Sequence, residues 1–103
     1  MFCGVLVTCP REKVESIAKS LLEKHLAVCI NIVPKVSSLF RWKDQIVQEI
    51  ESLLLIKTKL DRFDDLTNQI QAMHPYEIPE IIALPLLTGL SGYLDWVDKE
   101  TKC

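Results

Sequence analysis

The spacing of hydrophobic positions changes several times along this chain of 103 residues. Residues 4–8 form a short, nearly continuous apolar run that ends before Pro10, which is typical of a buried strand. The spacing then becomes three and four residues, and Pro10 suits the first turn of a helix while Lys24 and His25 suit its negative C-terminal end. The apolar face of this predicted helix carries Val14, Ile17, Ala18, Leu21 and Leu22.

Two long strand-like segments follow, from Ala27 to Trp42 and from Ile46 to Lys59. The first is interrupted at Pro34, and the polar residues around Asp44 favour a tight turn between the two segments. A strand of about 14 residues spans roughly 45 Å, whereas a globule of this size has a radius of gyration of about 13 Å. We therefore expect a long central hairpin that bends at Pro34 or protrudes.

The remaining pattern completes an α+β fold. Helical spacing returns over residues 60–73, a fourth strand is expected from Pro79 to Leu86, and a short C-terminal helix from Tyr93 to Lys99. The order βαββαβ predicts a ferredoxin-like fold, in which right-handed crossovers place both helices on one face of an antiparallel sheet. Residues 1–103 are expected to form a single domain. Two helices cannot cover both faces of such an apolar sheet, so assembly of more than one chain is expected.

Charge and composition exclude several classes of protein. The net charge is −2 and the Lys and Arg residues are scattered, which argues against nucleic acid or an anionic membrane as partner. No apolar run approaches the ~20 residues of a membrane span, and the start of the chain lacks the pattern of a signal peptide. The four cysteines form no C-x-x-C pair, so reduced thiols and a cytoplasmic location are expected.

The segment from His74 to Pro85 combines three prolines, two carboxylates, a histidine and a tyrosine with an apolar run. Each proline fixes φ and disfavours the helical region for the residue before it, so this segment is expected to be a stiff, extended connector. A connector that only protects a strand edge explains the same composition without any binding function.

The sequence His-Pro-Tyr-Glu-Ile-Pro-Glu-Ile-Ile-Ala-Leu-Pro at 74–85 resembles the motif of the CutA family of divalent-cation tolerance proteins. Residues 26–34, 38–42 with 53–58, and 93–96 resemble further motifs of that family, so the resemblance runs from about Val5 to about Val97. It implies a homotrimer around a three-fold axis. The chain departs from the family at the hairpin tip, where Lys43-Asp44-Gln45 replaces a turn with glycine. Aspartate tolerates the left-handed conformation, so the hairpin is still expected.

His74 is a candidate metal ligand, because imidazole is a common ligand and this ring stands in a constrained, partly polar setting outside the apolar core. The resemblance implies copper binding through histidine and cysteine, and Cys9 is the candidate thiol. A closed structural site would need four ligands at recognisable spacing. None is present in the sequence, so any site must be open, weak or shared between chains.

A second set of residues has types that could fix a small polar ligand, and the resemblance places it at subunit boundaries. The set comprises Cys29, Asn31, Trp42, Lys57, Tyr76, Glu77 and Glu80. An interface network is the competing interpretation, and Trp42 in particular is typical of a packing anchor. Strand parity predicts that Glu77 and Glu80 point to opposite faces, which disfavours a catalytic carboxylate pair.

No enzyme motif is present. The sequence lacks a P-loop, a dinucleotide-binding turn and a G-x-S-x-G turn, and no nucleophile has an identifiable base. We therefore expect a binding protein without catalytic activity, with copper or another divalent cation and no organic cofactor. Three classes stay open: a metal-binding protein, a trimeric small-ligand sensor and a scaffold for other proteins. The sensor hypothesis rests on analogy of fold alone.

Overall fold

The structure is a computed structural model, and it describes residues 1–102. Its elements follow the predicted order, with a short 3₁₀-helix added before the second α-helix: β1 (Phe2–Cys9), α1 (Arg11–Glu23), β2 (Cys29–Trp42), β3 (Gln45–Lys59), η1 (Leu60–Arg62), α2 (Phe63–Met73), β4 (Ile81–Pro85) and α3 (Ser91–Glu100). The strand expected from Pro79 is shorter than predicted, because residues 75–78 bend and pairing begins only at Ile81.

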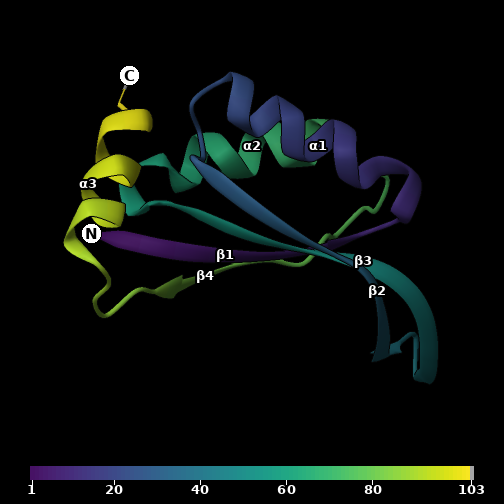
Figure 1. Cartoon of the computed structure of the whole chain (residues 1–103). Helices are drawn as coiled ribbons and strands as arrows, with labels where there is room; N and C mark the ends of the chain where they lie inside the picture. Colours follow the sequence, from purple (N-terminus) through teal and green to yellow (C-terminus); the bar gives the residue numbers. More distant parts are fainter. Residues whose placement is uncertain (103) are drawn as a thin grey trace.

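The four strands form one antiparallel sheet in the order β2-β3-β1-β4. Helices α1 and α2 lie side by side on one face of this sheet, while α3 lies at the end of the molecule that holds the N-terminus (Figure 1). An ion pair of 3.1 Å between Lys59 and Asp98 joins α3 to β3. The α+β ferredoxin-like architecture with a long hairpin and a short C-terminal helix is thus confirmed.

The core lies between the sheet and the two helices. Buried and half-buried residues alternate along β1, and its buried side chains pack with those of α1 and α2 because successive residues of a strand point to opposite faces. Fully buried members of this core include Val5, Val7, Ile17, Leu21, Leu54, Ile56, Leu66 and Ile70.

Helix α1 ends in a Schellman motif. The N–H of Leu26 donates to the carbonyl of Leu21 and that of His25 to the carbonyl of Leu22, and His25 has φ of 56° at the position where glycine is usual. Its ring nitrogen Nδ1 also lies 3.0 Å from the carbonyl oxygen of Glu100. The helix dipole alone, which the sequence suggested, is therefore an incomplete explanation of His25.

The hairpin of β2 and β3 continues well beyond the rest of the sheet. The last pair of β1 joins Cys9 to Ser52, so hairpin residues 36–51 pair only with each other among the described residues. The register shifts between Val33 and Val36, and the outer hairpin curves away from the helices (Figure 1). The predicted bend at Pro34 is confirmed, and the molecule extends over 44 Å.

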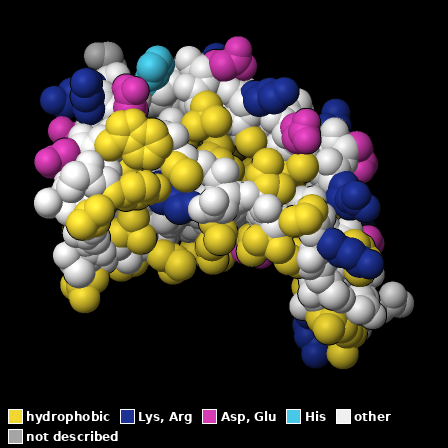
Figure 2. Space-filling model, in the orientation of Figure 1, with side chains coloured by type: hydrophobic (Ala, Val, Ile, Leu, Met, Phe, Trp, Pro, Cys, Tyr) yellow, Lys and Arg dark blue, Asp and Glu magenta, His cyan; other side chains and the backbone are white. Residues whose placement is uncertain are grey.

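The sheet face opposite the helices has no cover among the described residues. We call it the bare face and define it by Leu6, Leu53, Leu55, Ile82 and Leu84, which alternate with core residues along three strands. Figure 2 shows hydrophobic side chains along this concave underside. Ile82 and Leu84 are each nearly half exposed.

No helix in residues 1–102 is long and apolar enough to cross a membrane.

Candidate functional site

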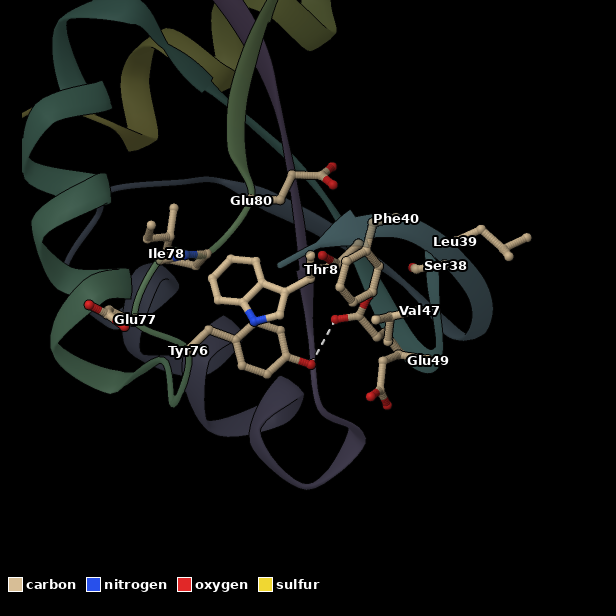
Figure 3. A pocket seen from close by; sticks show the side chains of 13 residues that line it. Thr8, Ser38, Leu39, Phe40, Val47, Glu49, Tyr76, Glu77, Ile78 and Glu80 are labelled. Atoms are coloured by element: carbon tan, nitrogen blue, oxygen red, sulfur yellow. Dashed lines mark hydrogen bonds between the residues drawn. The ribbon is translucent and has the colours of Figure 1, made fainter. Parts of the chain in front are cut away.

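The curved hairpin and residues 76–80 border an open groove of about 850 Å³, which we call the hairpin groove (Figure 3). It forms because β3 bends past the end of β1 and the chain after α2 passes the same place on its way to β4. The groove continues the side of the sheet that carries the bare face, since Glu49 and Glu51 share strand parity with Leu53. Its lining residues are Thr8, Ser38, Leu39, Phe40, Trp42, Val47, Glu49, Glu51 and 76–80.

His74 connects the groove to the sheet. Its Nε2 lies 2.8 Å from the carbonyl oxygen of Thr8, and its Nδ1 accepts a hydrogen bond of 3.1 Å from the backbone N–H of Tyr76. These partners define a neutral ring that carries its proton on Nε2. The ring is only 8% exposed, so it is buried, although it is not a member of the apolar core cluster.

Tyr76 and Glu51 form the polar centre of the groove. The Tyr76 hydroxyl donates a hydrogen bond of 2.9 Å to Oε2 of Glu51, and the Tyr76 ring packs 4.7 Å from the ring of His74. Burial, the hydrogen bond to Glu51 and the charges of Glu51 and Glu49 raise the pKa of Tyr76 to about 12. A phenol held neutral in this way donates a proton to a hydrogen bond and is not an activated nucleophile.

Cys9 lies under the helices and is fully buried. Burial, assisted by the charges of Glu51 and Glu12, raises the pKa of its thiol to about 11. Because a metal needs the thiolate, this environment disfavours metal binding at Cys9. Within residues 1–102, no three His, Cys, Asp or Glu side chains are grouped closely enough to hold a metal ion.

The predicted ligand set is divided between two places. Trp42, Tyr76, Glu77 and Glu80 line the hairpin groove. The other three residues, Cys29, Asn31 and Lys57, lie at the far end of the hairpin, where Lys57 pairs with Cys29 in the sheet and donates hydrogen bonds to Asn31 and to the carbonyl of Leu55.

This second place faces Tyr93 of α3. Burial, and after it the neighbouring side chain of Cys29, raise the pKa of Tyr93. Lys57 lies six positions after Glu51 in β3, which corresponds to about 20 Å along an extended strand.

The side chains of Glu77 and Glu80 point in different directions, as predicted, although the segment that carries them is not a regular strand (Figure 3). The chain bends over residues 75–78, and both residues line the groove. Glu49, Glu51 and Phe40 also line the groove and were not predicted from the sequence. The signal for the two carboxylates was their spacing of two residues in a strand, which places both on one face.

Comparisons with known proteins agree with this fold over nearly the whole chain. The family described as CutA1 divalent ion tolerance protein matches residues 3–100. The divalent-cation tolerance protein CutA of Thermus thermophilus is 47% identical over 98 residues, covering 94% of this chain and 95% of that protein. The solved Thermus structure has a TM-score of 0.97 at 45% identity and covers 99% of this chain and 100% of that one.

A human relative, Protein CutA, is 43% identical over 100 residues, which are 96% of this chain but 56% of the human protein. The chain therefore spans little more than half of that relative and nearly all of the Thermus one. On the family match and these identities, the chain belongs to the CutA1 divalent ion tolerance protein family.

Proposed function

We propose that this protein acts in divalent-cation tolerance as a homotrimer that binds copper. The Thermus relative and the matching family both carry divalent-cation or divalent-ion tolerance in their names. A binding role, as opposed to catalysis, is supported by the raised pKa values of Cys9 and Tyr76, since neither side chain is activated as a nucleophile.

The observation that carries the proposal is the uncovered apolar sheet. Ile82 and Leu84 are 47% and 46% exposed in the single chain, beside Leu6, Leu53 and Leu55 on the same face. Apolar surface of this kind favours association with another protein surface. The outer hairpin also has unpaired backbone edges that a second chain could satisfy. The number three comes from the family resemblance.

Copper binding would require His74 and Cys9 to give up their present hydrogen bonds or protons. At His74 the metal must replace the hydrogen bond to Thr8 or to Tyr76, and at Cys9 it must displace a tightly held thiol proton. A full ligand set would then need donors from more than one chain, because residues 1–102 of a single chain offer no group of three.

Native mass spectrometry of protein purified without added metal or chelator tests this proposal, because it counts chains and metal ions together. We expect three chains per particle, bound copper, and reduced copper uptake in His74→Ala. Cys3→Ser serves as the control. Unchanged copper uptake in His74→Ala with loss in Cys3→Ser would refute the assignment of copper to His74. Cys103, another candidate for adventitious thiol binding, lies outside the described residues.

We also propose a cytoplasmic location. The three described cysteines, Cys3, Cys9 and Cys29, are all unpaired, as in proteins of reducing compartments. Cell fractionation with an antibody to the chain tests this, and recovery in an oxidising compartment would contradict it.

A small-ligand sensor is the second candidate function. The hairpin groove favours it, because an open groove of about 850 Å³ with aromatic walls and a few polar groups is typical of small-molecule sites. Ligand titration of metal-free protein separates this candidate from metal tolerance.

A further inference from the structure

The outer part of the hairpin carries apolar side chains on both of its faces. Among the described residues, 36–51 pair only with each other. The register assigns Phe40 and Val47 to the side of the groove, and Ile46 and Ile50 to the opposite side. An antiparallel sheet with one face in solvent commonly has polar residues on that face, and a hairpin of two strands is only marginally stable by itself. Both faces of the outer hairpin therefore need a cover.

We call the side opposite the groove the outer face. Its side chains are those of Ser37, Leu39, Arg41, Ile46, Gln48 and Ile50. Leu39, Ile46 and Ile50 are 68%, 73% and 50% exposed, so nothing in the described chain covers them. Figure 3 shows Leu39, at the margin of the groove, extending away from Tyr76. Because the hairpin curves away from the helices, the outer face is convex and the groove lies on the concave side (Figure 1).

The two sides of the hairpin also differ in charge. Four carboxylates line the groove, from Glu49, Glu51, Glu77 and Glu80, and its described lining contains no Lys, Arg or His. The outer face has one charged residue, Arg41, which is exposed and forms no ion pair within residues 1–102. Arginine is enriched at interfaces between chains, where its guanidinium pairs with carboxylates. The outer face thus complements the groove in both shape and charge.

A single chain cannot bring these two surfaces together, because they lie on opposite sides of the same hairpin. Contact between them requires two copies. Each copy then uses its groove toward one neighbour and its outer face toward the other, and such head-to-tail contacts close into a ring when the rotation between copies allows it. The groove continues the side of the sheet that carries the bare face, so this contact would extend the same interface.

We propose that the hairpin groove of one chain receives the outer face of the hairpin of a second copy. The aliphatic side chains of the outer face pack against the aromatic walls of the groove, and Arg41 of the incoming copy faces the three exposed carboxylates, those of Glu49, Glu77 and Glu80. This inference rests on the proposed trimer. It competes with the sensor function, because a groove filled in this way has no room for a small ligand.

The first test reverses the charge of the outer face. Light scattering over a dilution series, in a fixed urea concentration that brings the wild-type trimer into its dissociation range, measures the strength of assembly. Arg41→Glu places a carboxylate against the acidic groove and should raise the concentration of half-dissociation at least about tenfold. Lys19→Glu is the matched control, because it makes the same change on the exposed surface of α1 and should have no effect.

The second test reverses one groove charge in the Arg41→Glu chain, by Glu49→Arg, Glu77→Arg or Glu80→Arg. If the two surfaces meet, at least one of these double variants should return to within about threefold of the wild type. Glu23→Arg, which adds the same charge at the end of α1, should not rescue assembly. Rescue also excludes a folding defect, since a second charge reversal does not repair a misfolded chain.

Wild-type assembly in Arg41→Glu, or failure of all three groove variants to rescue it, would refute the contact and leave the trimer standing. A wild type with the mass of one chain in the absence of urea would refute the trimer and this contact together.

Discussion

His74, Tyr76 and Glu51 connect three distant parts of the chain through hydrogen bonds. His74 spans from the carbonyl of Thr8 to the backbone of Tyr76, and the Tyr76 hydroxyl reaches Glu51. The sequence singled out His74 and Tyr76 as candidate site residues. It could not identify their partners, because contacts between residues 25 and 66 positions apart are set by the tertiary fold.

Because the pKa of Tyr76 is raised, the free energy of unfolding should depend on pH in the alkaline range. The phenol titrates near 10 in an unfolded chain and at about 12 in the folded one, so the folded state holds the proton more tightly. Its contribution is therefore complete below pH 10 and is lost as the pH rises toward 12.

Tyr76→Phe should lower the free energy of unfolding by about 1–3 kcal/mol below pH 10, because buried Glu51 loses its hydrogen-bond donor. The difference from the wild type should then narrow between pH 10 and 12. Urea unfolding at fixed protein concentration measures both effects. Tyr93→Phe is the control, because it removes a phenol that forms no hydrogen bond with Glu51. A difference that stays constant up to pH 12 would show that Tyr76 is not coupled to Glu51.

At the scale of elements, the sequence predicted best what depends on local pattern. The two main helices and the hairpin follow from spacing and from Pro34, and the structure has them. The start of β4 was placed two residues too early, because pairing with β1 decides where a strand begins and that information is not local. The Schellman ending of α1 was missed since His25 occupies a position where glycine is the usual signal.

The hairpin turn carries backbone strain that a substitution can relieve. Trp42 pairs with Gln45, so Lys43 and Asp44 form a two-residue turn, and their φ values are 50° and 64°. Such turns favour Asn-Gly, because both central residues need positive φ. Asp44→Gly should therefore raise the free energy of unfolding by about 0.5–1 kcal/mol.

Asp64→Gly is the control for this prediction, because Asp64 lies in the first turn of α2 with helical geometry. There the same change should lower stability by a few tenths to about 1 kcal/mol. Thermal unfolding at one protein concentration compares the two variants. Destabilisation by Asp44→Gly would mean that the Asp44 side chain stabilises the turn more than its backbone strains it.

For the molecule as a whole, the bare face is the feature that favours self-association. The sequence predicted that two helices would leave apolar sheet uncovered, and the structure has Leu84 and Ile82 nearly half exposed opposite the helices. The groove could not be predicted in the same way, since it depends on the direction in which the hairpin curves. Self-association through the bare face is the central claim, and it predicts that a charge placed there will separate the chains.

Light scattering coupled to size exclusion at micromolar concentration tests this claim most directly. The wild type should elute with the mass of three chains of 11.8 kDa each, and Leu84→Asp on the bare face should shift the mass to that of one chain. Leu22→Asp, an exposed leucine on α1, should keep the mass of three. A wild-type particle with the mass of a single chain would contradict the account.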